Sequence, residues 1–183
     1  MTIRKLVLSL GATIGCALAL SACASTRDSI DAAALAPIAP ISSVVLTSTG
    51  LQIDGAARGV GRFGSSEADV TPALTRVFDT EAVSSDNPDC PGGPLTIVSW
   101  TRYMWTTYKD GKLVGWLTED PVLGTPAGVR LGWTRSQVEA LPDFATPPTK
   151  AAAIEIKADG VSGFITEGPD GYVELLWSGE VCL

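Results

Sequence analysis

The sequence has no histidine at any of its 183 positions. Histidine is the usual general base of Ser-His-Asp and Cys-His arrangements and a frequent ligand of transition metals, so its absence excludes most sites of those kinds. The sequence also lacks a C-x-x-C pair, a G-x-S-x-G elbow and an S-x-x-K spacing. We therefore expect no catalytic residues, no metal site and no cofactor, which favours a non-enzymatic protein.

Basic residues are scarce as well. The chain has 13 Lys and Arg against 20 Asp and Glu, which gives a net charge of -7. Binding to nucleic acid depends on basic contacts with phosphates, and electrostatic attachment to anionic lipid depends on a basic patch. We expect no nucleic-acid partner and no membrane attachment through charge.

The one long apolar run is too short to cross a membrane comfortably. Residues 6–20 carry no charge and follow Arg4 and Lys5. About 15 residues at roughly 1.5 Å each span about 22 Å, less than the roughly 30 Å hydrocarbon core of a bilayer. A basic start, an apolar stretch and small residues in this order are typical of an export signal.

The end of this run, Leu20-Ser21-Ala22-Cys23, resembles the bacterial lipobox. The resemblance implies cleavage between Ala22 and Cys23, removal of residues 1–22, and a diacylglycerol thioether on Cys23. Two acyl chains anchor a protein more firmly than one. We therefore expect a lipid-anchored protein on the outer face of the cell membrane; the alternative is an ordinary secretory signal that uses Ala22-Cys23-Ala24.

The next segment reads as a tether. Residues 23–43 have no aromatic side chain and contain Pro37 and Pro40. Such a segment buries too little apolar surface to offset the entropy lost on ordering. We expect a flexible tether, followed by a globular domain over residues 44–183 with two repeats, about 44–120 and 121–183.

The globular part contains two cysteines, Cys90 and Cys182. In an exported protein an even pair indicates a disulfide, and closing a loop of roughly 90 residues contributes about 4 kcal/mol in the chain-entropy model. We predict a Cys90–Cys182 bond. The alternative is two independent thiols.

Two stretches, residues 60–74 and 128–142, are alike at an offset of 68 positions. Ser66 and Thr134 occupy corresponding positions and are good helix N-caps, and Thr134 together with Gln137 matches a capping box. Each stretch therefore predicts a helix that begins just after a glycine. We expect both helices to be short, because Pro72 would interrupt the first or restart it with Thr71 as a new cap, and Pro142 would end the second.

Strand patterns follow each predicted helix. Residues 95–100, 102–108 and 112–117 follow the first, and residues 153–157, 161–166 and 172–177 follow the second. Asp-Gly pairs at 110–111, 159–160 and 170–171 predict turns between them. The pattern favours an α+β fold, an antiparallel sheet covered on one face by short helices.

The repeated pattern Gly-x-Ser/Thr-x-x-acid/amide-Val before several strands resembles the tandem repeat of secreted β-lactamase inhibitor proteins. It also resembles the single repeat of small outer-membrane assembly lipoproteins. Residues 51–142 resemble a group of uncharacterised actinobacterial lipoproteins and secreted proteins. These resemblances imply the α+β fold and an actinobacterial envelope, and the inhibitor family's acidic hairpin tip makes Asp110 a candidate binding residue.

Aromatic residues gather in the first set of strands. Tyr103, Trp105 and Trp116 are candidate binding residues, although core packing is the alternative for each. We expect a cell-surface module that binds an unidentified envelope protein. The alternatives are binding of a wall glycan or small ligand through exposed aromatics, or a carboxylate-based hydrolase built from the acidic pairs Glu67/Asp69, Asp79/Glu81 and Glu119/Asp120.

Overall fold

The computed structural model describes residues 43–100, 104–148 and 153–183. They belong to one compact unit, which we call the folded unit. The predicted signal, the cleavage and lipidation residues Ala22 and Cys23, residues 23–42 of the tether, and Tyr103 lie outside the described residues. No helix within the described ranges has the length and apolar character needed to cross a bilayer.

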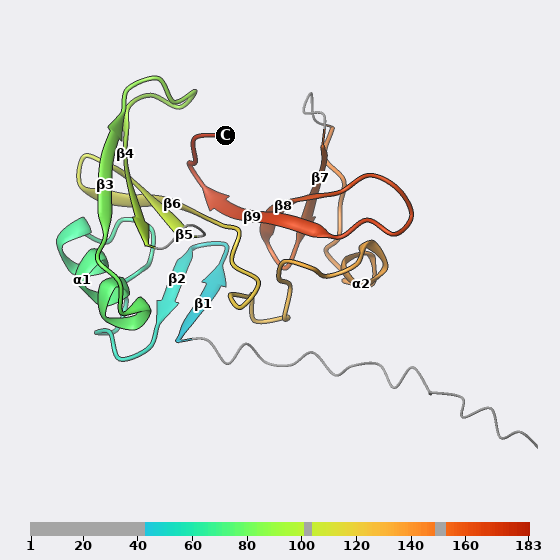
Figure 1. Cartoon of the computed structure of the whole chain (residues 1–183), viewed down its shortest axis with the longest axis horizontal. Coiled ribbons are helices and arrows are strands. Elements are labelled where there is room, and N and C mark those ends of the chain that lie inside the picture. The colour runs from blue at the N-terminus through green and yellow to red at the C-terminus, as the bar shows by residue number, and fades with distance from the viewer. Residues whose placement is uncertain (1–42, 101–103, 149–152) are drawn as a thin grey trace, which may run out of the picture. The chain divides into compact units, whose positions relative to one another are not determined.

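A seven-stranded sheet dominates the folded unit (Figure 1). Its spatial order is β3-β4-β5-β6-β9-β8-β7, and every neighbouring pair is antiparallel. The strands are β3 (Val83–Asn87), β4 (Leu95–Trp100), β5 (Met104–Lys109), β6 (Lys112–Thr118), β7 (Ile154–Ala158), β8 (Val161–Ile165) and β9 (Val173–Gly179).

A two-stranded hairpin and two helices complete the described elements. The hairpin pairs β1 (Val44–Thr47) with β2 (Gly50–Ile53), and the helices are α1 (Glu67–Phe78) and α2 (Arg135–Glu139). The helices and the hairpin contribute residues to one core cluster with the sheet. The predicted α+β class is confirmed.

Both helices begin where the sequence predicts. The Ser66 side chain accepts a hydrogen bond from the Asp69 N–H, and the Thr134 side chain accepts one from the Gln137 N–H. In α2 the Gln137 side chain also accepts a bond from the Thr134 N–H at 2.8 Å, which completes the capping box. A local side-chain match was sufficient to locate both helix starts.

The predicted break at Pro72 is wrong, because α1 continues through this residue to Phe78. Proline removes one intrahelical hydrogen bond, and it disfavours a helix interior. The same helix buries Val70, Ala73 and Leu74 against the sheet. Packing of this apolar stripe outweighs the cost of the proline, and the helix has 12 residues.

Two of the three Asp-Gly pairs form tight turns with positive φ. Asp110 and Gly111 have φ of 51° and 70° between β5 and β6, and Asp159 and Gly160 have φ of 50° and 71° between β7 and β8. These angles are those of the type I′ turns that join twisted antiparallel strands. The residues between β8 and β9 form a longer connection, in which Gly168 has the positive φ of 94°.

The two similar stretches make the same backbone contacts. The Gly64 N–H donates to the carbonyl of Leu113 in β6, and the Gly132 N–H donates to that of Val173 in β9, both at 2.8 Å. Their partner strands, β6 and β9, are neighbours in the sheet and run antiparallel. Antiparallel pairing of equivalent strands is what a two-fold relation between the stretches requires.

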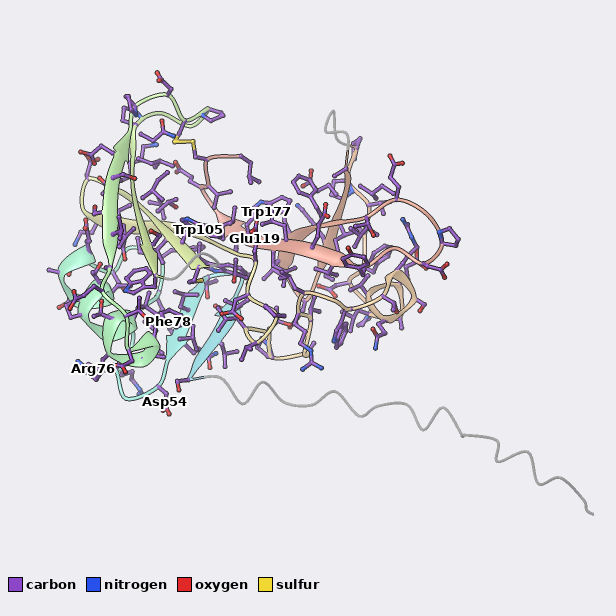
Figure 2. The ribbon with its side chains drawn as sticks, in the orientation of Figure 1. Asp54, Arg76, Phe78, Trp105, Glu119 and Trp177 are labelled. Carbon is purple, nitrogen blue, oxygen red and sulfur yellow. A yellow bond between two sulfur atoms is a disulfide. The ribbon has the colours of Figure 1, made fainter. Side chains whose placement is uncertain are left out.

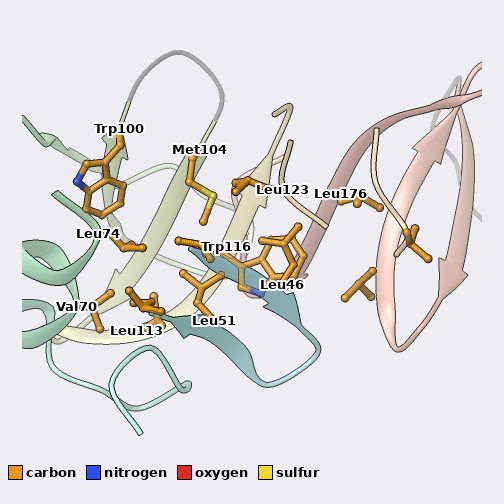
Figure 3. Packing of buried hydrophobic residues seen from close by; sticks show 14 of the residues in the cluster. Leu46, Leu51, Val70, Leu74, Trp100, Met104, Leu113, Trp116, Leu123 and Leu176 are labelled. Carbon is orange, nitrogen blue, oxygen red and sulfur yellow. The ribbon is translucent and has the colours of Figure 1, made fainter. Parts of the chain in front are cut away.

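The core lies between the sheet, α1 and the β1–β2 hairpin (Figure 3). Trp100 and Trp116 are completely buried. Their indole N–H groups donate to Thr75 Oγ1 at 2.9 Å and to the Thr47 carbonyl at 3.0 Å. Trp116 is thus a core residue with a satisfied polar atom, and it is not available for binding at the surface.

Candidate functional site

The face of the sheet opposite the core carries its own apolar side chains. Successive residues of a strand point to opposite faces, so Trp105 faces away from the core residue Met104. Leu117 of β6 is paired with Trp105 of β5 on one side and with Trp177 of β9 on the other. Figure 2 shows both tryptophans on the side of the sheet away from β1 and β2. We call this side the outer face.

Six residues of the outer face form what we call the apolar patch, and none of them belongs to the core cluster. They are Ile97, Trp105, Leu117, Phe164, Leu175 and Trp177. Most are half-buried, and Trp177 is 9% exposed because its ring packs 4.8 Å from that of Phe164, centroid to centroid. Mutual packing keeps these side chains in place although no described helix covers them.

Polar residues surround the patch. Ser99, Thr107 and Ser162 lie beside it, and Glu155 and Lys157 lie on β7 at the sheet margin. A row of paired residues crosses five strands from Ser99 to Ser162 through the two tryptophans. At about 4.8 Å per strand the row is about 19 Å wide, enough to contact a protein surface or several sugar rings.

The C-terminal segment, residues 180–183, lies along one part of the outer face. The Glu180 N–H donates to the Val114 carbonyl at 2.9 Å, and Thr107 Oγ1 donates to the Glu180 carbonyl. Lys109 Nζ lies 3.0 Å from Glu180 Oε2. The predicted Cys90–Cys182 disulfide is confirmed, and it joins this segment to the β3–β4 connection (Figure 2).

The structure separates the candidate binding residues of the sequence. Trp105 lies in the apolar patch, whereas Trp116 lies in the core. Asp110 lies in the β5–β6 turn beside a different hollow, which it shares with Asp86. Only Trp105, of the candidates within the described residues, is part of the apolar patch.

Four residues of the acidic pairs have local structural roles. Glu67 and Asp69 lie in the first turn of α1, where the helix dipole favours negative charge. Asp79 is the left-handed C-cap of that helix. Asp120 accepts a hydrogen bond from the Val122 N–H at 2.9 Å. None of these contacts indicates a catalytic role, and the described ranges contain no cluster of His, Cys, Asp or Glu suited to a metal.

Asp143 is a further acidic residue with a structural role. Hydrogen bonds from the backbone N–H groups of Asp159 and Gly160 hold the pKa of Asp143 below its usual range. The bond from Gly160 measures 2.8 Å. This carboxylate connects the loop after α2 to the β7–β8 turn.

Most of the patch was missed by sequence reasoning, although a signal was present. The strand 95–100 reads LTIVSW, with Leu95 and Ile97 alternating with Thr96 and Val98. Apolar residues on both alternating sets are typical of a strand with two apolar faces. Read in that way, the strands would have indicated a second apolar surface in addition to the core.

These features define an α+β protein with one large antiparallel sheet, a core on one face and an apolar patch on the other. The fold is similar to that in the crystal structure of the uncharacterized protein YfeY from Escherichia coli, with a TM-score of 0.51 and 14% sequence identity. The similarity covers 75% of this chain and 99% of YfeY. No protein-family model matches the sequence, and no curated protein matches it. The similarity to YfeY therefore shows the fold alone.

Proposed function

We propose that this chain is an exported lipoprotein, anchored by diacylglycerol on Cys23, whose folded unit is a non-enzymatic module that binds an envelope protein. The observation that carries the proposal is the apolar patch on the outer face of the sheet. Protein interfaces combine an apolar centre, enriched in aromatic residues, with a polar rim. The patch and its surrounding hydroxyl and charged residues have this composition.

The composition of the patch favours a protein over a glycan. Ile97, Leu117 and Leu175 are aliphatic and offer no flat ring on which a sugar could stack. The second candidate, a wall glycan, is supported by Trp105 and Trp177 on the same face. The resemblance of the repeats to tandem-repeat inhibitor proteins also supports a protein partner.

The test measures retention of the folded unit, with its disulfide intact, on cell envelopes purified from the source organism. We expect protease treatment of the envelopes to abolish retention. We also expect Trp105→Lys to lower retention at least tenfold, because it places an unpaired charge in the patch. The matched control is Val122→Lys, which places the same charge at an apolar residue that is 62% exposed and outside the patch.

Two outcomes would contradict the proposal. Retention that survives protease treatment would identify a glycan or lipid as the ligand. Equal retention of the Trp105→Lys and Val122→Lys variants would show that the outer face is not the binding surface.

A further inference from the structure

The C-terminal segment forms one wall of a groove on the outer face. The floor contains Ile97, Trp105 and Leu117 of the apolar patch, and the wall contains Val181 and Cys182. The groove has a volume of about 320 Å³. This is at the lower end of the roughly 300 to 1,000 Å³ that is usual for small-ligand sites.

The wall is fastened to the fold at several points. The Glu180 N–H donates to the Val114 carbonyl, and the Lys109 ammonium contacts the Glu180 carboxylate. The Cys182 sulfur is bonded to Cys90 and accepts a hydrogen bond from Asn87 Nδ2 at 3.2 Å. The C-terminal segment contributes no side chain to the core cluster. The disulfide therefore fixes the position of this segment, and with it the wall of the groove.

The groove has no charged side chain in its lining. Other hollows of the described residues do: one has Arg58 and Arg62, another has Asp86 and Asp110, and a third has Asp120. The groove's lining also contains three hydroxyl groups, of Ser85, Ser99 and Thr107.

Two of those hydroxyl groups already have partners. Ser99 Oγ donates to the Val83 carbonyl at 3.3 Å, and Thr107 Oγ1 donates to the Glu180 carbonyl. A charged group entering the groove would lose water and gain no opposite charge. The lining therefore suits an uncharged, apolar group.

We propose that this groove binds a bulky apolar side chain, such as Leu, Phe or Trp, of the partner protein. This inference rests on the proposed function and names the part of the partner that the outer face recognises. Interfaces obtain most of their affinity from a few anchors in well-packed pockets, and aromatic side chains are frequent anchors. The groove adjoins the cross-strand row at Trp105 and Leu117, so an anchor in it would lie at one end of the larger apolar patch.

The test uses small probes and the isotope-labelled folded unit, observed by two-dimensional amide NMR. The apolar probes are N-acetyl-leucinamide and N-acetyl-tryptophanamide. The comparison probes are charged N-acetyl-aspartamide and the neutral sugar N-acetylglucosamine. We expect saturable shifts of the Ser99, Trp105 and Thr107 amides with the apolar probes, with dissociation constants at least tenfold lower than for the comparison probes.

Variants connect the shifts to the groove. Ile97→Arg fills the floor, and we expect it to abolish the saturable shifts. Val122→Arg places the same side chain at a 62% exposed residue outside the patch and the groove, and its dissociation constants should stay within twofold of the parent. Val181→Gly removes a wall side chain without touching the core, and it should weaken probe binding at least threefold even if Ile97→Arg fails to fold.

Three results would overturn the inference: no saturation with the apolar probes, equal shifts with the sugar, or unchanged binding in the Val181→Gly variant. Failure here is distinguishable from failure of the proposed function. If the folded unit still binds envelopes in a protease-sensitive and Trp105-dependent way, the outer face binds a protein without a side-chain anchor in the groove.

Discussion

The Tyr108 hydroxyl is a polar atom in the core, and its ionisation is coupled to folding. The side chain is 1% exposed, and its hydroxyl lies 3.2 Å from Thr106 Oγ1 and 3.5 Å from Thr71 Oγ1. Burial raises the pKa of Tyr108 above its ordinary value near 10. The folded chain therefore holds this proton more tightly than the unfolded chain does.

This coupling predicts a loss of stability at alkaline pH. Below about pH 10 the side chain is protonated in both states, and the free energy of unfolding falls as the pH rises from there through the folded-state pKa. Tyr108→Phe should lower the free energy of unfolding by about 1 kcal/mol at pH 7 and should reduce its decline at alkaline pH. Tyr172→Phe, at a half-exposed residue, should leave that decline unchanged. Urea unfolding between pH 7 and 11 measures both. An unchanged decline in Tyr108→Phe would show that another group causes it.

At the scale of single elements, α1 contains a proline that it tolerates at a cost. Pro72 is exposed, and the helix is held by Val70, Ala73 and Leu74, which face the core. Pro72→Ala would return an N–H that can bond to the Ala68 carbonyl and would remove the clash of the ring with the preceding turn. It would also increase the entropy of the unfolded chain, which offsets about 0.4 to 1 kcal/mol of the stability gained in the helix.

We expect Pro72→Ala to raise the free energy of unfolding by about 2 kcal/mol, since the helix penalty of proline is about 3 kcal/mol relative to alanine and the unfolded-state term offsets up to about 1 kcal/mol of it. The control is Pro88→Ala in the connection after β3, where only the unfolded-state term applies and stability should fall slightly. Denaturant unfolding of both variants measures the difference. A destabilised Pro72→Ala variant would mean that the proline ring makes a necessary contact.

At the scale of the whole molecule, the disulfide joins residues that are 92 positions apart. Neither Cys90 nor Cys182 belongs to the core cluster. We expect the Cys90→Ser, Cys182→Ser double variant to keep its sheet and to lose about 4 kcal/mol of unfolding free energy, because the unfolded chain is no longer constrained. Circular dichroism and denaturant unfolding check this, and a loss below about 1 kcal/mol would contradict the chain-entropy account.

The same double variant separates stability from binding. Without the disulfide the C-terminal segment keeps its contacts through Glu180 but loses its covalent link to the β3–β4 connection, so the groove should lose the fixed position of its wall. At a denaturant-free condition where the variant is folded, apolar probes should bind at least fivefold more weakly than to the parent. NMR titration of the two proteins measures this, and equal binding would show that the wall is not needed.

Local signals in the sequence predicted the features that depend on near neighbours. Each N-cap depends on one side chain, that of Ser66 or Thr134. The turn at Asp110 depends on the backbone angles of two neighbouring residues. The pairing of Cys90 with Cys182 also followed, because the folded unit contains two cysteines and therefore has one possible internal bond. The α+β class followed from helix and strand patterns in sequence order.

The tertiary structure decided which side of each strand is inside. Trp105 and Trp116 are both tryptophans within predicted strands, and the sequence does not distinguish them. The β5–β6 register places Trp105 on the outer face and Trp116 in the core. Strands with apolar residues on both alternating sets do not reveal which set faces the helices. The packing of α1 against the sheet also keeps this helix continuous at Pro72, where the sequence predicted a break. The sequence by itself determined both helix starts, the turns at Asp110 and Asp159 and the later strands of the large sheet, since these depend on local chemistry. It did not predict β1, β2 or β3. The outer face and its groove required the assembled sheet, because they are formed by residues brought together from four strands and the C-terminus.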